Sequence, residues 1–158
     1  MLKISPCLWF DGQGEEAAKF YTSIFKRSKI GPILRYGEGA PFPKGTALVV
    51  YFTIEGQSYL ALNGGPHYKF TPAISLSVDC KTQKEVDYYW DKLMAGGGKP
   101  MACGWLTDKY GVSWQVVPEN LPKRLRDKDP VKAARVMEAM MGMIKLDMAA
   151  LEKAYKGK

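Results

Sequence analysis

The sequence predicts an α+β protein made of two tandem βαβββ-type modules, each running strand, helix and then further strands, followed by a helical tail. Three observations lead to this fold class. Strand-like and helix-like segments follow one another in a fixed order, the order occurs twice at an offset of about 68 residues, and the tail shows helical spacing alone. We therefore expect one domain over residues 1–120, built of modules 3–65 and 72–119, and a helical C-terminal extension over residues 121–158.

The first module opens with an apolar run from Ile4 to Phe10, which is typical of a strand. The turn over residues 11–14 leads into a helix, because Glu15 and Glu16 suit the positive end of a helix dipole and apolar residues recur behind them at helical spacing. Three further strands are predicted at Lys29–Tyr36, Thr46–Glu55 and Ser58–Leu62. A tight turn joins the last two of them.

The second module repeats this plan. Ala73–Val78 predicts a strand, and Thr82 with Glu85 three residues later forms a capping box that begins a helix. Because short turns join the strands after each helix, these strands should pair antiparallel, and two such modules would form a cupped mixed sheet around a shared cavity. The last two strands are predicted at Lys99–Leu106 and Val112–Val117.

The tail carries most of the excess positive charge. Of the chain's net charge of +7, residues 121–158 contribute +5, from 10 basic and 5 acidic residues. Aspartates interrupt the basic run and no aromatic residue lies within it, so the pattern favours a solvated basic helix over a nucleic-acid site. One helix is predicted from Pro130, with Asp129 as its N-cap, and a second helix from Asp147 to Tyr155.

An apolar stripe on the first tail helix is predicted to pack on the domain or on a second copy of the chain. Its methionines allow a second interpretation, in which the stripe is a pliable surface for another partner. The stripe consists of Val131, Ala134, Met137, Met141 and Ile144.

Composition excludes several classes of protein. A chain of 158 residues that is 46% hydrophobic and 25% charged is globular in composition rather than disordered. No run reaches the roughly 18 apolar residues of a membrane span, and the N-terminal residues lack the pattern of a signal peptide. Three unevenly spaced cysteines form no disulfide ladder, which favours a reducing, cytoplasmic location. The single histidine, His67, excludes a zinc site with two or three histidines from one chain.

Aromatic residues on separate predicted strands are the main candidates for a ligand site. Rings that point inward would line an apolar cavity for a planar or apolar ligand, which neighbouring polar side chains, including Ser113 and Asn63, could orient. Alternation along a strand allows only one of Tyr51 and Phe52 to face such a cavity. In the alternative interpretation the rings fill the core and leave no cavity. The predicted ligand-binding residues are Trp9, Phe52, Ser75, Trp105, Trp114 and Gln115.

Two residues are candidates for catalysis. Cys103 lies in a predicted strand, where a nearby cation could make its thiol nucleophilic, and the alternative is a buried, inert cysteine. His67 follows a turn and could act as a general base, and the alternative is a histidine of a surface loop. Because spacing brings no two ionisable groups together, the sequence assigns no acid–base pair and leaves open whether the protein is an enzyme.

Several short motifs occur in a characteristic order, namely Trp9-Phe10-Asp11-Gly12, Asn63-Gly64-Gly65-Pro66, Cys103-Gly104-Trp105 and Asp108-Lys109-Tyr110-Gly111-Val112-Ser113-Trp114-Gln115. Together they resemble the PhnB-like proteins, also labelled demethylubiquinone methyltransferase-like, over residues 3–119. That family lies in the vicinal oxygen chelate superfamily of glyoxalases, bleomycin-resistance proteins and extradiol dioxygenases. The resemblance implies paired βαβββ modules, a cupped sheet and a homodimer.

The resemblance also implies where a metal ion would bind. Metal-dependent members of the superfamily hold the ion with His and with Glu or Gln on inward positions of the first, fourth, fifth and last strands. Here only Gln115 matches such a position, and a single amide oxygen holds a divalent ion poorly. No metal or other cofactor is therefore predicted. The methyltransferase label is not followed either, because the chain lacks a glycine-rich loop of the kind that holds a nucleotide cofactor.

The leading hypothesis is a metal-independent protein that binds a small molecule and works as a cytoplasmic homodimer, with no membrane or nucleic-acid partner. One alternative is an enzyme of the superfamily, such as a lyase, isomerase, dioxygenase or transferase, that depends on a divalent metal or on Cys103. Another alternative is an interaction protein that acts through its basic, methionine-rich tail.

Overall fold

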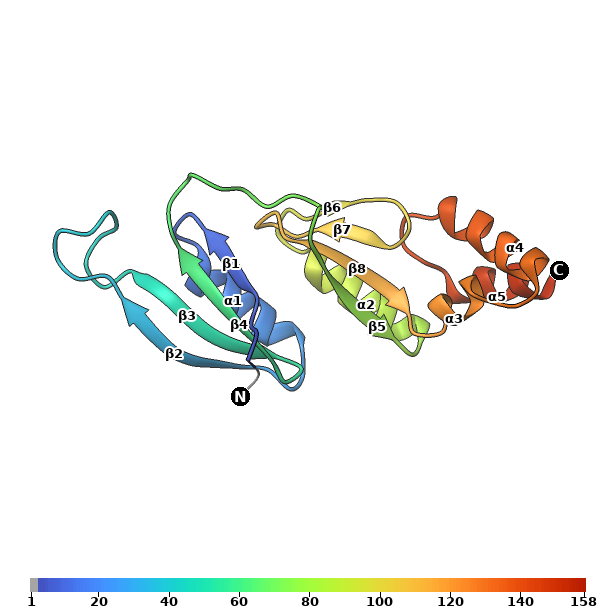
Figure 1. Ribbon diagram of the computed structural model, residues 1–158, viewed down its shortest axis with the longest axis horizontal. Coiled ribbons are helices and arrows are strands. Elements are labelled where there is room, and N and C mark those ends of the chain that lie inside the picture. Colours follow the sequence, from blue (N-terminus) through green and yellow to red (C-terminus); the bar gives the residue numbers. More distant parts are fainter. Residues whose placement is uncertain (1–2) are drawn as a thin grey trace. The chain divides into compact units, whose positions relative to one another are not determined.

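The computed structural model describes residues 3–158 and divides the chain into two compact units, one ending at Phe70 and one running from Thr71 to Lys158 (Figure 1). Each unit contains one four-stranded mixed sheet and a helix that packs on it. The predicted α+β class is thus confirmed. The three helices of the tail belong to the second unit.

The first unit contains a sheet in the order β1-β4-β3-β2. Strand β1 pairs parallel with β4, and the other neighbours pair antiparallel, as the short turns predict. Its elements are β1 (Cys7–Phe10), α1 (Gly14–Ile24), β2 (Lys29–Arg35), β3 (Ala47–Ile54) and β4 (Gln57–Asn63).

The second unit repeats this topology, with a sheet in the order β5-β8-β7-β6 and one parallel pair, β5 with β8. The parallel pairs start at equivalent places: Cys7 lies opposite Leu60 in the first unit, and Ser75 lies opposite Ser113 in the second. Cys7 and Ser75 are 68 residues apart, which confirms the repeat and its offset. The elements are β5 (Ser75–Cys80), α2 (Gln83–Met94), β6 (Lys99–Pro100), β7 (Trp105–Thr107) and β8 (Ser113–Pro118).

The prediction of one strand over Lys99–Leu106 is wrong. The chain makes a short hairpin there, in which β6 and β7 pair antiparallel around a turn. Two consecutive residues of the turn, Cys103 and Gly104, have φ values of +60° and +81°. A strand cannot pass through this left-handed region, so the predicted run is divided into two strands.

One face of each sheet is covered by the helix of its own unit. In the first sheet, alternation places Phe52 and Val50 of β3 on the same face as Phe10 of β1, and the Phe52 ring stacks on Tyr21 of α1 at 6.3 Å between centroids. We call the opposite face of each sheet its open face. On the first sheet the open face carries Cys7, Trp9, Val49, Tyr51, Thr53, Ser58, Leu60 and Leu62, and on the second it carries Ser75, Ser77, Asp79, Trp105, Thr107, Ser113, Gln115 and Val117.

The predicted helix caps at Thr82 and Asp129 are confirmed, and Asp147 is a third cap that was not predicted. Thr82 Oγ1 accepts a hydrogen bond from the Glu85 amide at 3.2 Å, and Glu85 reaches back to the Lys81 amide at 2.7 Å. In the tail, Asp129 accepts from the amides of the first turn after Pro130, and Asp147 accepts from the amide three residues later. These short polar side chains satisfy amides that the helix itself leaves unpaired, which is why each helix begins there.

The tail consists of α3 (Leu121–Leu125), α4 (Pro130–Met141) and α5 (Met148–Lys156), which enclose a small core of their own. The predicted apolar stripe of α4 does not pack on the domain, because Val136 is fully buried, whereas Met137 and Met141 are 44% and 63% exposed. Its packing on a second copy of the chain, or on another partner, stays a prediction. Apolar residues lie on two sides of α4, and the side that carries Val136 packs into the core of the tail. The buried residues of this core are Leu121, Val136, Leu146 and Leu151.

Hydrogen bonds attach the tail to the rest of the second unit. The Gln83 amide of α2 donates to the Leu146 carbonyl at 3.2 Å and its oxygen accepts from the Met148 amide at 2.8 Å. The Cys103 amide also donates to the Met143 carbonyl at 2.8 Å. Among residues 3–158, no helix has the length and apolar character needed to cross a bilayer.

Candidate functional site

The open face of the second sheet brings three of the predicted ligand-binding residues together. Ser75 on β5, Gln115 on β8 and Trp105 on β7 lie on adjacent strands, with Gln115 directly opposite Trp105. The Gln115 side-chain amide donates to Ser75 Oγ at 2.9 Å. All three are half-buried, so a ligand can reach them while they remain fixed by the sheet.

Ser113 completes this group. It lies between Ser75 and Thr107 on the neighbouring strands and, two residues before Gln115 on β8, points to the same face. Ser113 is 1% exposed, and its hydroxyl has no hydrogen-bond partner among the described residues. A buried hydroxyl without a partner is uncommon in folded proteins and needs a physical explanation.

Two predicted ligand-binding residues face the other way. Phe52 is 2% exposed and stacks between Tyr21 of α1 and its cross-strand neighbour Tyr59, so its prediction as a cavity residue is wrong. Trp114 is also 2% exposed and lies on the helix-covered side of β8, so that prediction is wrong as well. For these two rings the alternative interpretation, that they fill the core, is correct.

Asp108 is the residue that fixes Trp114, and the sequence analysis did not identify it. Asp108 is 3% exposed, and its carboxylate accepts the Trp114 indole N–H at 2.8 Å, together with the amides of Tyr110 and Val112 at 2.8 and 3.1 Å. Charge-assisted hydrogen bonds of this kind make the burial of a carboxylate tolerable. The signal in the sequence is an aspartate three residues before Gly111, a common turn pattern. Its role here is to hold the turn before β8.

Trp9 lies on the open face of the first sheet, as a ligand-binding role requires, but its ring is already engaged. Its indole N–H donates to the Gly65 carbonyl at 2.8 Å, and Tyr68 meets the ring edge-on at 4.9 Å between centroids. Gly64 lies against the ring so closely that a methyl group there would overlap it. Trp9 therefore anchors the loop after β4.

The two catalytic candidates lie in different units. His67 is exposed in the turn after Gly65. Cys103 lies in the β6–β7 turn, where its sulfur is 3.8 Å from the Met141 sulfur. A thioether supplies no positive charge to stabilise a thiolate. Of the other thiols, Cys80 is inert because burial raises its pKa to about 12.

The donor groups of the second open face do not fit a transition-metal ion. Ser75, Ser113 and Gln115 offer two hydroxyls and a carboxamide, whereas first-row divalent ions select imidazole, thiolate or carboxylate ligands. Across residues 3–158, no three His, Cys, Asp or Glu side chains are grouped closely enough to hold an ion.

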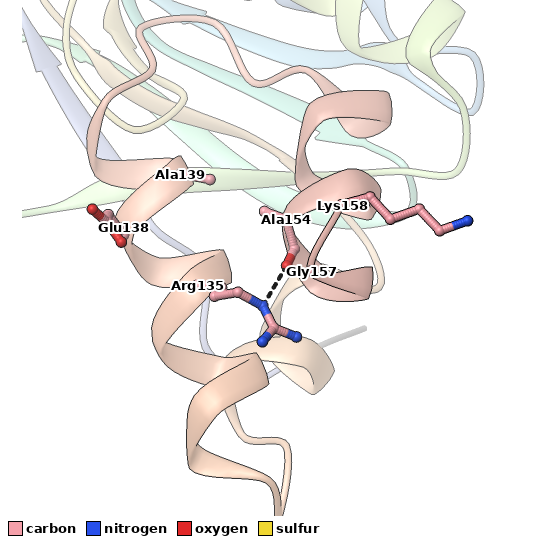
Figure 2. Close-up of a pocket in the computed structure, with 6 residues that line it drawn as sticks. All are labelled: Arg135, Glu138, Ala139, Ala154, Gly157 and Lys158. Atoms are coloured by element: carbon pink, nitrogen blue, oxygen red, sulfur yellow. Dashed lines mark hydrogen bonds between the residues drawn. The ribbon is translucent and has the colours of Figure 1, made fainter.

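A surface hollow of about 370 Å³ lies between α4 and α5, and none of its lining residues is a predicted site residue (Figure 2). Its main polar group is Arg135, which donates to the Ala154 carbonyl at 2.9 Å and to the Tyr155 carbonyl at 3.0 Å. These bonds add to the Gly157 amide, which already donates to the Ala154 carbonyl at 3.1 Å, in satisfying the C-terminal end of α5. The hollow is therefore a by-product of a helix cap.

Comparison with known proteins agrees with this architecture. A family model described as 3-demethylubiquinone-9 3-methyltransferase matches residues 2–117. The solved structure of the PhnB protein from Bacillus cereus is 40% identical, has a TM-score of 0.68, and is matched over 74% of this chain and 99% of that chain. A family model over most of the chain and a relative at 40% identity together show the family. The chain belongs to the PhnB-like family described as 3-demethylubiquinone-9 3-methyltransferase.

More distant structures share the fold alone. A protein from Pseudomonas aeruginosa is 23% identical with a TM-score of 0.61, over 75% of this chain and 98% of that chain. The fosfomycin resistance protein FosX from Listeria monocytogenes, solved in complex with Mn(II) and a sulfate ion, is 15% identical with a TM-score of 0.53, over 80% of this chain and 98% of that chain. No curated protein matches the chain. The family match ends at residue 117, so the tail lies outside it.

Proposed function

We propose that this protein binds a small organic molecule on the open face of its second sheet, without a metal ion. The observation that carries the proposal is the Gln115–Ser75 hydrogen bond of 2.9 Å beside the half-buried ring of Trp105. An aromatic face next to a few fixed polar groups is the usual composition of a small-molecule site, where the ring supplies contact area and the polar groups set orientation.

The nature of the donors supports binding without metal. A hydroxyl and a carboxamide that are already hydrogen-bonded to each other can exchange hydrogen bonds with an organic ligand, but they provide no negative charge for a divalent ion. The Mn(II) named for the Listeria protein therefore does not transfer to these residues.

The family description names a methyltransferase, and the first unit offers a partial likeness to a cofactor loop. Gly12 lies in the turn between β1 and α1, and Gly14 is the first residue of α1, where a nucleotide-binding loop would lead into its helix. The Gly14 amide instead donates to Asn63 Oδ1 at 2.8 Å. A Cβ atom at position 14 would lie 2.9 Å from the same Asn63 oxygen. This close packing argues against assigning the methyltransferase reaction to the chain.

We also propose that the protein is a cytoplasmic homodimer. The family resemblance supports the dimer, and three free cysteines support a reducing compartment. Light scattering coupled to size-exclusion chromatography would test the dimer directly: a monomer mass across the accessible concentration range would refute it.

The test of the binding proposal is native mass spectrometry with elemental analysis of freshly purified protein. We expect no stoichiometric metal and a retained organic mass, and we expect that mass to be lost in Gln115→Ala. The matched control is Gln57→Ala in the first unit, whose side chain bonds only to the adjacent Ser58 carbonyl and which should keep the molecule. A stoichiometric divalent metal, or an organic mass that both variants retain equally, would overturn the proposal.

A further inference from the structure

The apolar stripe predicted on the tail lies at the surface of the second unit. This tail stripe consists of Val131, Ala134, Met137, Met141 and Ile144. Ala134 is exposed, and the other four residues are between 44% and 63% exposed. Surface helices ordinarily turn polar residues to water, so an apolar outer face marks an interaction surface. We infer that the tail stripe binds an amphipathic helix of another protein, and that the flanks of that helix are acidic.

The tail stripe has the geometry of a helix–helix contact. Its members on α4 recur every three or four residues, on the side of the helix away from the buried Val136. From Val131 to Met141 they extend over about 15 Å, at 1.5 Å per residue. Ala134 is small enough for a second helix to approach closely, and the flexible methionines can adapt to its side chains. A partner helix of about three turns, with an apolar stripe of its own, would therefore cover this face.

Basic side chains lie next to the tail stripe. Lys128, just before α4, is exposed and forms no ion pair with any residue that the structure describes. Arg135 follows Val131 by one helical turn, on the flank of the stripe. Glu138 is acidic, but it lines the hollow between α4 and α5 together with Arg135 and Lys158, which outnumber it (Figure 2). With a net charge of +5, the tail attracts and orients a partner whose flanks are acidic.

Two other occupants fit the tail stripe less well. A second copy of the chain would bring another tail of charge +5 against the first, and like charges repel. The proposed dimer does not require this contact, because the family match that supports it ends at residue 117. A bilayer surface is also disfavoured, since the stripe lacks the Trp, Phe and Leu side chains that enter a membrane interface. The stripe shares no residue with the second open face, so this partner is separate from the proposed small-molecule ligand.

The test uses two synthetic helical peptides of about 18 residues, each with the same leucine stripe. One carries glutamates on both flanks, and its counterpart carries lysines at the same positions. Binding to the full-length protein is followed by the NMR signals of the Met137 and Met141 methyl groups. We expect the acidic peptide to shift both signals, with an affinity that falls as salt screens the charges. The lysine peptide should shift neither signal.

Substitutions of exposed residues test the same contact without disturbing the core. Met141→Gln should weaken binding of the acidic peptide about 5- to 20-fold, because much of an apolar side chain is no longer buried by the partner. Lys128→Glu should weaken it about 2- to 5-fold at low salt. Ile74→Gln, at a position 64% exposed in the same unit, and Lys69→Glu, at an exposed position of the first unit, are the matched controls and should leave binding unchanged.

Several results would overturn the inference. Equal binding of the two peptides, shifts from neither peptide, or full binding by Met141→Gln would each do so. If the double variant Met137→Gln with Met141→Gln converted a dimer into a monomer in light scattering, a second copy of the chain would be the occupant instead. Co-sedimentation with vesicles of phosphatidylcholine and phosphatidylserine that is lost in the same double variant would assign the stripe to a membrane surface. Each of these results leaves the proposed small-molecule site standing, because that site is tested by the mass retained on purification.

Discussion

The two units have the same topology but very different open faces. At positions related by the repeat, Cys7, Trp9, Leu60 and Leu62 in the first unit correspond to Ser75, Ser77, Ser113 and Gln115 in the second. The helix-covered faces are alike, with Leu8 and Phe10 matched by Leu76 and Val78. The two units therefore share a fold through similar apolar residues on their covered faces, while the residues on their open faces differ in chemistry.

The open faces of the two sheets therefore suit two different roles. An apolar open face with a tryptophan tied to its own loop is a packing surface, whereas a face of serines, a glutamine and one tryptophan can exchange hydrogen bonds with a ligand. This contrast is the reason for placing the candidate site on the second sheet rather than on the first.

The largest expected effect comes from comparing a residue on the covered face with one on the open face of the second sheet. Trp114→Ala should lower the free energy of unfolding by about 3–5 kcal/mol or more, because it removes a fully buried ring and leaves the buried Asp108 carboxylate without one donor. Trp105→Ala, on the open face, should cost less than half as much. Urea unfolding of both variants makes the comparison, and equal losses would show that the two faces are assigned wrongly.

The first unit offers the same contrast between neighbours in sequence. Phe52→Ala should cost about 3–5 kcal/mol of unfolding free energy, because its ring packs against α1. Tyr51→Ala, next to it but 40% exposed on the open face, should cost about 1 kcal/mol or less. Urea unfolding of both variants measures the two losses of unfolding free energy. A larger loss for Tyr51→Ala would mean that the open face of the first sheet is the better packed one.

Apolar residues in the sequence show which face of a helix or strand is buried when they lie on one face only. They do not show it when they lie on both faces. The order of strands and helices, the repeat and the caps at Thr82, Asp129 and Asp147 are predictable because each depends on local chemistry. In β3 the run Leu48–Ile54 is apolar or aromatic at nearly every position, so alternation cannot say which of Tyr51 and Phe52 faces the helix.

The same limit explains the other errors. In α4 apolar residues surround the helix, and only the tail core decides that Val136 rather than Met137 is buried. Trp114 looked like a candidate for lining a cavity because nothing local shows that Asp108 accepts its indole N–H. The pairing of Gln115 with Ser75 also depends on strands 40 residues apart in sequence, which meet only in the folded sheet.

A smaller effect tests the role of Trp9 as an anchor in the first unit. Gly64→Ala should destabilise the protein by about 1–3 kcal/mol, because the added methyl group overlaps the indole ring. In a Trp9→Ala background the same substitution should cost little, so a double-mutant cycle should give a coupling energy of about the same size. An absence of coupling would show that the ring moves aside freely, and the first open face would then be as adaptable as the second.

The smallest effect compares equivalent positions in the first turns of α1 and α2. Gln83, 68 residues after Glu15, bonds to the tail, whereas Glu15 bonds to Arg35 of β2 at 2.8 Å and to Lys19 at 2.9 Å. The Arg35 and Lys19 cations lower the pKa of Glu15 from 4.5 to about 2. Since the pKa is lower in the folded state than in the unfolded state, the stabilisation is present above pH 4.5, declines as the pH falls below 4.5, and is lost as the pH falls through about 2.

Arg35→Ala should therefore raise the pKa of Glu15 towards its ordinary value, as a carboxyl NMR titration would show. Because the Arg35 side chain is 45% exposed, water screens the pair and the loss of stability at pH 7 should be small. The loss should be smaller at pH 2, where Glu15 is protonated in the unfolded state and about half protonated in the folded state. Lys44→Ala, which breaks the exposed Lys44–Glu38 pair, is the control and should change stability little at either pH. A loss for Arg35→Ala that is equal at pH 7 and pH 2 would mean that Arg35 acts through packing rather than charge, and that α1 is attached to its sheet without electrostatic help.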